Sequence, residues 1–170
     1  MIRIEQADRN NFTLTSLDLF DRFQEVRNVF RLVDGKLVLR YNPFTDDWYA
    51  ERRREKAGEI LSGDFITYCA YDGDRVVGEI MLVPEFDGGR MIIDSFHVSR
   101  DRRREGIGRM LFDRAAAEAR SRGASALYIS ACSAEETIGF YLAMGCVPSE
   151  NPIASYAEDE PCDIQMERRL

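Results

Sequence analysis

Residues 99–111, SRDRRREGIGRML, constrain the fold more than any other stretch of this chain. A run rich in β-branched and apolar residues, 90–98, precedes them, and an alanine-rich run with helical spacing follows. A glycine turn that opens a helix presents main-chain N–H groups at the positive end of the helix dipole, and nearby arginines add bidentate donors. The stretch therefore predicts a strand–turn–helix unit that binds a diphosphate or a triphosphate.

Two β-hairpins are predicted before this unit. Asp34-Gly35 lies between two β-rich runs within residues 27–44, and Asp72-Gly73 lies between two more within residues 65–83. Asp and Gly tolerate the positive φ angles that tight hairpin turns need. We expect each pair of runs to form two antiparallel strands.

The helices are predicted from caps and apolar spacing. Thr45 and Asp46 are placed to cap a helix through residues 46–61, which Gly63 ends. The helix after the glycine turn is expected over about 108–120. Its buried stripe consists of residues four apart: Ile107, Leu111, Ala115 and Ala119.

The C-terminal part of the chain adds two strands and a helix. Residues 125–130 are predicted as a strand, and residues 162–168 alternate as a half-buried strand does. Ser133 and Glu136 have the spacing of a capping box, which opens a short helix that stops at Gly145. We therefore expect one domain over residues 1–170, with a mixed sheet and helices in an α+β arrangement.

Composition excludes several classes of function. The net charge of −7 argues against nucleic-acid binding, which needs a broad basic face. No apolar run approaches the roughly 18 residues that a bilayer crossing needs, and the start, MIRIE, is charged too early for a secretory signal, so we expect a cytoplasmic protein without membrane contact. Four scattered cysteines and one histidine predict neither disulfides nor a metal site.

Two common phosphate-binding motifs fit the glycine turn poorly. A P-loop needs a lysine after its last glycine, and none follows Gly108. A Rossmann fingerprint needs Gly or Ala where Leu111 stands, and it belongs to the first strand of a βαβ unit, whereas this turn follows several strands. Nucleotide hydrolysis and dinucleotide binding are therefore disfavoured.

Two motifs together resemble the GCN5-related N-acetyltransferase (GNAT) superfamily. The family pattern [R/Q]-x-x-G-x-[G/A] is matched by RREGIG at 103–108, after the strand end Phe96-His97-Val98. A later helix of the form F-Y-x-x-x-G is matched within ETIGFYLAMGC, 136–146. The resemblance implies a central mixed, mostly antiparallel sheet flanked by helices, with residues 63–170 as the acyl-CoA-binding core and 1–62 as the acceptor-site portion.

By this resemblance the co-substrate is acetyl-CoA. Val98 is implied to pair with the pantetheine arm through its main chain, and the turn to hold the pyrophosphate. The full set of implied cofactor-binding residues is Phe96, His97, Val98, Arg103, Arg104, Glu105, Gly106, Ile107, Gly108, Arg109, Ser133 and Phe140. Many members carry Asn-x-x-Ala where this chain has Ala134 and Thr137, so that side-chain contact is not expected here.

The resemblance also places Tyr141 as a general acid for the leaving thiolate. The attacking amine must lose a proton, and Glu79, Asp94 and His97 are the candidate bases in predicted central strands. Strict alternation puts Asp94 on one strand face with Phe96 and Val98, and puts His97 on the other face with Ser95 and Ile93.

The expected function is N-acetyl transfer to a primary amine of a small molecule or a peptide. A GNAT-fold module that binds acyl-CoA without turnover and a nucleotide-phosphate binder are the alternatives. Acidic residues 158–160, together with Trp48, Asn151 and Tyr156, are candidates for the acceptor pocket. A homodimer is a further expectation, because the Asp34-Gly35 hairpin offers an edge for pairing.

Overall fold

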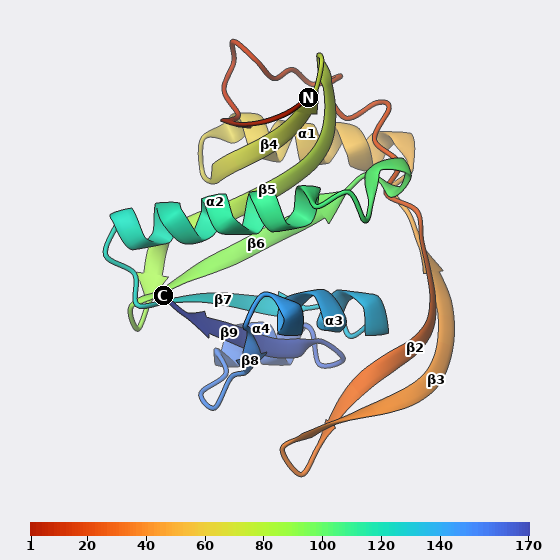
Figure 1. The fold of residues 1–170 in the computed structure, drawn as a ribbon, viewed down its shortest axis with the longest axis vertical. Coiled ribbons are helices and arrows are strands. Elements are labelled where there is room, and N and C mark those ends of the chain that lie inside the picture. Colours follow the sequence, from red (N-terminus) through yellow and green to blue (C-terminus); the bar gives the residue numbers. More distant parts are fainter.

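Seven strands form one sheet in the computed structural model, which describes all of residues 1–170 (Figure 1). Only the pair β6–β7 is parallel, and every other neighbouring pair is antiparallel. The predicted mixed, mostly antiparallel sheet is therefore confirmed. In sheet order the strands are β1 (Ile2–Gln6), β4 (Ile66–Asp72), β5 (Arg75–Asp87), β6 (Arg90–Val98), β7 (Ala126–Ala131), β9 (Ile164–Arg169) and β8 (Val147–Pro148).

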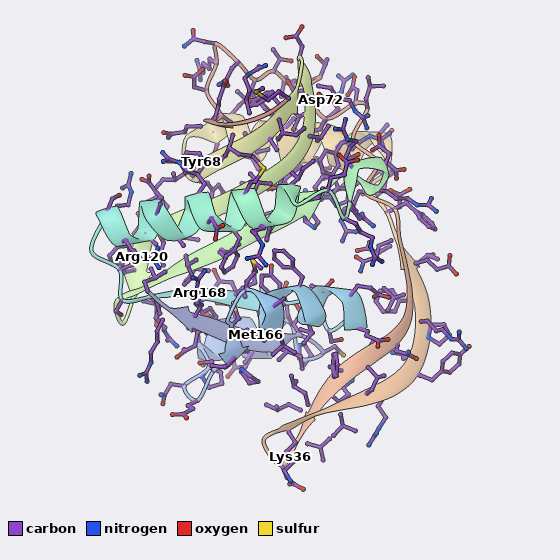
Figure 2. The ribbon with its side chains drawn as sticks, in the orientation of Figure 1. Lys36, Tyr68, Asp72, Arg120, Met166 and Arg168 are labelled. Carbon is purple, nitrogen blue, oxygen red and sulfur yellow. The ribbon has the colours of Figure 1, made fainter.

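A separate two-stranded arm projects from the body of the molecule (Figure 1). It consists of β2 (Gln24–Val33) and β3 (Lys36–Asp46), joined by a turn in which Asp34 and Gly35 have φ values of 49° and 75°. Both values match the twist that a tight hairpin needs, so this predicted hairpin is confirmed. Lys36 lies at the tip of the arm, far from the sheet (Figure 2). The outer edge of β3 has no strand partner, and pairing of two copies through it stays a prediction.

Helices cover both faces of the large sheet (Figure 1). One face carries α2 (Ile107–Ser121), with α3 (Glu135–Ala143) beside it, and the other carries α1 (Ala50–Ser62). A short helix, α4 (Ala154–Asp159), precedes β9. No helix is both long enough and apolar enough to cross a membrane.

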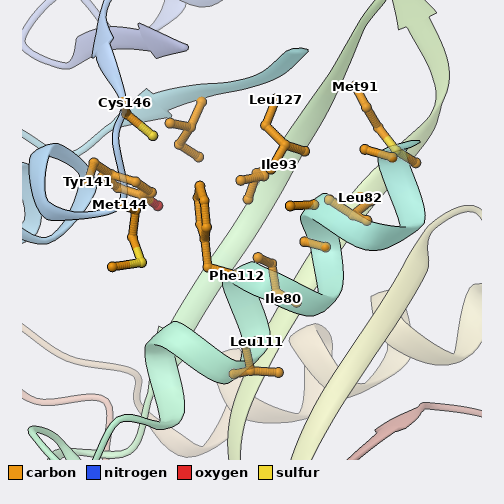
Figure 3. Packing of buried hydrophobic residues seen from close by; sticks show 14 of the residues in the cluster. Ile80, Leu82, Met91, Ile93, Leu111, Phe112, Leu127, Tyr141, Met144 and Cys146 are labelled. Atoms are coloured by element: carbon orange, nitrogen blue, oxygen red, sulfur yellow. The ribbon is translucent and has the colours of Figure 1, made fainter. Parts of the chain in front are cut away.

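Each covered face has its own apolar core. The larger core joins α2 and α3 to the sheet, and Figure 3 shows Leu111 and Phe112 of α2 among the sheet residues, with Tyr141 of α3 opposite. The predicted stripe on α2, from Ile107 to Ala119, is buried and confirmed. The smaller core packs α1 and the segment around Phe20 against the other face.

Two predicted helix caps are wrong. Helix α1 begins at Ala50, because Thr45 and Asp46 continue strand β3. The N-cap of α3 is Ala134 without a side-chain cap, because the Ser133 hydroxyl instead accepts a hydrogen bond from Arg31 Nη1 at 2.8 Å. In both places the predicted cap residue instead belongs to, or is hydrogen-bonded by, a strand of the arm.

A bulge in β6 redirects its side chains. The pairing with β5 steps from Met81 opposite Ser95 to Leu82 opposite Ile93, so Asp94 is the extra residue. Ile93 and Phe96 consequently both pack in the core on the α2 side. The predicted alternation of this strand is therefore wrong, because a bulge breaks the period of two.

The same strand parts from its neighbour. Strand β6 pairs with β7 only over Arg90–Ile93, so its edge from Asp94 to Val98 has no strand partner on that side (Figure 1). The Ser99 N–H donates to Val77 O, and alternation therefore turns the main-chain groups of Val98 and Phe96 to the unpaired edge. The Val98 end of this edge lies beside the turn that precedes α2.

Close packing of α2 on β5 depends on Gly78. A Cβ at this position would lie 2.8 Å from Leu111 Cδ1 and 3.2 Å from Ile107 Cγ2. We predict that Gly78→Ala lowers the free energy of unfolding by about 1–3 kcal/mol, because overpacking forces α2 away from the sheet.

Urea denaturation measures this effect, with Gly139→Ala as the matched control. No atom lies within 4 Å of a Cβ at Gly139, and the residue is inside α3, so the control is expected to be neutral or to stabilise by about 0.5–1 kcal/mol. Equal stabilities of the Gly78→Ala protein and the original protein would contradict the packing described here.

Candidate functional site

The turn before α2 has a row of free main-chain donors. No atom of the chain accepts a hydrogen bond from the N–H groups of residues 104–109. Arg104 and Gly106 adopt left-handed φ angles of 67° and 83°, which bend the turn into the helix N-terminus. Free N–H groups and the helix dipole together make this end of α2 suited to a phosphate.

Side chains around the turn hold it in place. Arg103 Nε donates to Val98 O at 2.9 Å, and its Nη2 donates to Arg22 O at 3.1 Å. Arg102 pairs with Asp72 and with Glu105. These arginines therefore fix the main chain of the turn, while Arg104 and Arg109 remain exposed at its surface.

Asp101 and its two hydrogen-bond donors, which we call the Asp101 clamp, fix the start of the turn. Asp101 accepts hydrogen bonds from Arg75 Nη1 at 2.7 Å and from Ser99 Oγ at 2.7 Å. The hydrogen bonds from Arg75 and Ser99 lower the pKa of Asp101 to about 2. Arg100 lies over the Phe23 ring, 4.7 Å from its centroid, and thereby contacts the segment before the arm.

Aromatic side chains form a wall beside the unpaired edge of β6. The rings of Phe96, Phe112, Phe140 and Tyr141 contact one another with centroid separations between 5.4 and 6.5 Å. A Cβ at Gly108 would lie 3.2 Å from the Phe140 ring, so this glycine lets the turn approach the wall.

Tyr141 places one polar atom in that apolar wall. The residue is buried, yet its hydroxyl has no hydrogen-bond partner in the chain and is not among the polar atoms wholly shielded from solvent. Burial raises the pKa of Tyr141 well above its ordinary value, so the phenol keeps its proton at neutral pH. The group is therefore able to donate that proton at the unpaired edge.

The opposite face of β6 carries a polar network. His97 Nδ1 lies 2.7 Å from Glu79 Oε1, and Ser95 Oγ donates to the same carboxylate oxygen at 2.9 Å. Glu79 is fully buried, whereas the His97 side chain is 25% exposed. Trp48 packs with its ring centroid 4.8 Å from that of His97.

Asp94, the third candidate base, lies apart from this network. Its side chain is exposed and accepts no hydrogen bond from the chain. Partial desolvation raises the pKa of Asp94, and nearby Glu59 and Glu160 contribute to the rise. The bulge turns Asp94 towards Glu59 on α1 and towards Glu160 at the end of α4.

The remaining predicted site residues are spread around this centre. Ser133 is buried beneath the arm, where its carbonyl accepts the Phe30 N–H at 2.7 Å. Tyr156 lies on α4, with its ring centroid 6.2 Å from that of Tyr128. The main-chain carbonyl of Asn151 accepts a hydrogen bond from Arg90 Nη1 at 2.7 Å, so Asn151 makes a structural contact.

Two buried cations at the site were not predicted from the sequence. Arg22 is 6% exposed and pairs with Asp46 at 2.8 Å, and its guanidinium lies over Trp48. Lys56 is 5% exposed and pairs with Glu59 at 2.5 Å. No local sequence pattern predicts that either residue is buried, because their burial results from tertiary packing of α1 and of the segment before β2.

Comparisons with known proteins agree with this geometry. The model of the acetyltransferase (GNAT) family matches residues 24–146. Both motifs and the network on β5 and β6 fall inside the matched range. A comparison with curated protein sequences found no significant relative.

Solved structures of the same fold align along the whole chain. Nourseothricin acetyltransferase is 21% identical, with 99% of this chain and 98% of that chain covered and a TM-score of 0.74. A Bacillus anthracis protein named as a streptothricin acetyltransferase, solved with acetyl coenzyme A, is 15% identical over 100% and 98% of the chains, with a TM-score of 0.73. PaiA N-acetyltransferase from Thermoplasma acidophilum, solved with coenzyme A, is 15% identical over 100% and 99%, with a TM-score of 0.65.

The Asp101 clamp generates a pH-dependent prediction. Because its folded pKa is about 2 and its ordinary value is 3.8, the clamp stabilises the fold above pH 3.8 and loses this effect as the pH falls towards 2. We predict that Asp101→Asn lowers the free energy of unfolding at pH 7 and that the difference from the original protein shrinks steadily below pH 3.8.

Urea unfolding at a series of pH values checks this, with Glu85→Gln as the control. Glu85 is an exposed carboxylate on β5 that accepts no hydrogen bond from the chain, so its replacement is expected to change little at any pH. A difference for Asp101→Asn that stays constant from pH 7 to pH 2 would contradict the charged clamp.

Proposed function

The chain belongs to the acetyltransferase (GNAT) family, and from that premise we propose that it transfers the acetyl group of acetyl-CoA to a primary amine of a small molecule. The prediction of an acyl-CoA-dependent N-acetyltransferase is confirmed at the level of the family. The proposal covers three further points: a small-molecule acceptor, the roles of individual residues and a cytoplasmic location.

One observation carries the proposal above all others. The N–H groups of residues 104–109 are free, consecutive and placed at the N-terminus of α2. A pyrophosphate bridging them would receive donors from the main chain without displacing any internal bond. The acetyl-CoA and coenzyme A complexes of the structural neighbours support the choice of this ligand.

The unpaired edge of β6 extends this site towards the reacting group. The main-chain groups of Phe96 and Val98 face that edge, and an amide-containing arm laid along it would pair as an added strand does. Val98 O already accepts from Arg103 at 2.9 Å, so the turn and the edge are held in one fixed geometry. The thioester would then lie near the aromatic wall.

Tyr141 would protonate the leaving sulfur. The pKa of a thiol is about 8.5, so the leaving sulfur takes up a proton at neutral pH. The hydroxyl of Tyr141 is protonated, unpartnered and placed on the wall beside Phe96 and Phe140. The phenol would give its proton to the thiolate and recover one from the new amide nitrogen.

Acidic groups on the α1 side favour a cationic acceptor. Burial raises the pKa of Asp94, and the charges of Glu59 and Glu160 add to this rise, while Lys56 opposes it. Neighbouring structures named for acetylation of nourseothricin, streptothricin and aminoglycosides support a small molecule with several amino groups. An amine that arrives protonated would be drawn to this side.

We predict that acetyl-CoA and coenzyme A bind the protein and that ADP binds more weakly, because ADP lacks the pantetheine chain that would pair with the β6 edge. NAD is expected not to bind, since its second nucleotide has no matching strand–turn–helix unit. Titration calorimetry of the four ligands measures this order. Binding of ADP or NAD alone would overturn the proposed co-substrate and favour a nucleotide-phosphate binder.

We predict that Tyr141→Phe lowers kcat by about 100-fold and leaves the Kd for acetyl-CoA unchanged, because only proton donation is lost. Thiol release measured with a panel of polyamines and amino-group antibiotics gives kcat. Tyr41→Phe is the matched control, since Tyr41 is 72% exposed on the arm. Equal kcat in both variants would remove Tyr141 from the mechanism, and binding without turnover by the original protein would favour the non-catalytic module.

A further inference from the structure

We propose that His97 is the general base that deprotonates the acceptor amine and that Glu79 is the residue that positions it. This inference rests on the proposed acetyl transfer and adds the base to it. Glu79, Asp94 and His97 are all candidates by sequence, and their placement in the fold separates them.

Glu79 holds the imidazole in one tautomer. A carboxylate accepts hydrogen bonds and donates none, so the 2.7 Å contact with His97 Nδ1 requires the proton to lie on Nδ1. The lone pair of neutral His97 is then on Nε2. Ser95 Oγ donates to the same Glu79 oxygen at 2.9 Å and fixes the carboxylate from the second side.

Access to solvent assigns the two roles. Glu79 is completely buried and is out of reach of an acceptor, whereas the His97 side chain is 25% exposed. Glu79 Oε2 is buried and accepts no hydrogen bond from the chain. A carboxylate beside Nδ1 would stabilise the imidazolium that forms when Nε2 takes a proton.

The surroundings of His97 keep it neutral before the reaction. Burial lowers the pKa of His97 below 6.5, with a smaller contribution of the same sign from Arg22 and Lys56, while Glu79 opposes the shift. These charged groups come from β5, from α1 and from the segment before β2, and Trp48 closes the remaining side. An imidazole that is neutral at pH 7 is ready to accept a proton.

Acid and base lie on opposite faces of one strand. Phe96 packs against Tyr141 on the α2 side, with centroids 6.3 Å apart, and the next residue, His97, points to the α1 side. A thioester laid along the unpaired edge would pass between them. The amine would approach from the side of α1, where the acidic residues lie, and the sulfur would leave on the side of Tyr141.

The proton balance of the reaction is complete with these groups. The ammonium gives one proton to His97 Nε2, and the free amine attacks the thioester carbonyl carbon. The C–N bond forms and the C–S bond breaks, while Tyr141 protonates the thiolate and regains a proton from the amide nitrogen. His97 returns its proton to solvent, so the products are the amide, the free thiol and one proton.

The first test reads His97 directly and needs no acceptor. Because the chain has one histidine, two-bond ¹H–¹⁵N spectra of uniformly labelled protein report that residue alone. We expect the Nδ1–H tautomer at pH 7, protonation below pH 6.5, and loss of the single tautomer in Glu79→Gln. A dominant Nε2–H tautomer in the original protein would overturn the proposal.

The second test is kinetic. We predict that His97→Gln lowers kcat by about 100-fold or more with the Kd for acetyl-CoA unchanged, and that the fall of kcat at acid pH disappears in this variant. Glu79→Gln is expected to lower kcat less and to move the acid limb of the profile. Added imidazole is expected to restore part of kcat to His97→Ala, which a purely structural role would not allow.

Glu85→Gln, an exposed carboxylate on the strand that carries Glu79, is the control and should keep the kcat and pH profile of the original protein. Turnover by His97→Gln equal to that of the original protein would overturn the base while leaving acetyl transfer in place. Failure of the original protein to bind acetyl-CoA would overturn the proposed function itself, and the base with it.

Discussion

The parting of β6 from β7 is the constraint on which the rest of the site depends. The two strands pair only as far as Ile93. The bulge at Asp94 then changes which face of the sheet the following side chains point to. An unpaired strand edge inside a sheet leaves main-chain donors and acceptors free to pair with a ligand or another strand. Here the edge leads directly to the free N–H groups before α2.

Arginines connect this edge to both faces of the sheet. Arg103 joins the turn to Val98 and to the main chain of Arg22, and Arg22 in turn covers Trp48, which contacts His97. The turn proposed to bind the phosphates and the face that carries the proposed base are therefore parts of one packed unit. The arm adds to it, because Gln24 and Asn28 bond to Thr137 and Glu135 on the helix of Tyr141.

Local signals in the sequence predict the parts of the fold that local forces determine. The Asp34-Gly35 turn, the glycine turn at 106–108 and the stripe on α2 follow from backbone conformation and helical spacing, and each is found where predicted. None of these features needs knowledge of distant contacts.

Features that depend on distant contacts are missed. The bulge at Asp94 arises from pairing with β5, and the helix caps at Thr45 and Ser133 fail because the arm takes those residues. No local pattern encodes the hydrogen bonds from Arg103 to the main-chain carbonyls of Val98 and Arg22. The proposal of His97 as the base likewise depends on a contact with Glu79, which lies on another strand.

The most direct measurement of this account is the amide spectrum of residues 104–109 during titration with coenzyme A. If these N–H groups bind the pyrophosphate, their proton resonances move downfield together and their exchange with solvent slows at the same ligand concentration. Unchanged amides in this turn, with coenzyme A bound and shifts confined to other segments, would contradict the central claim.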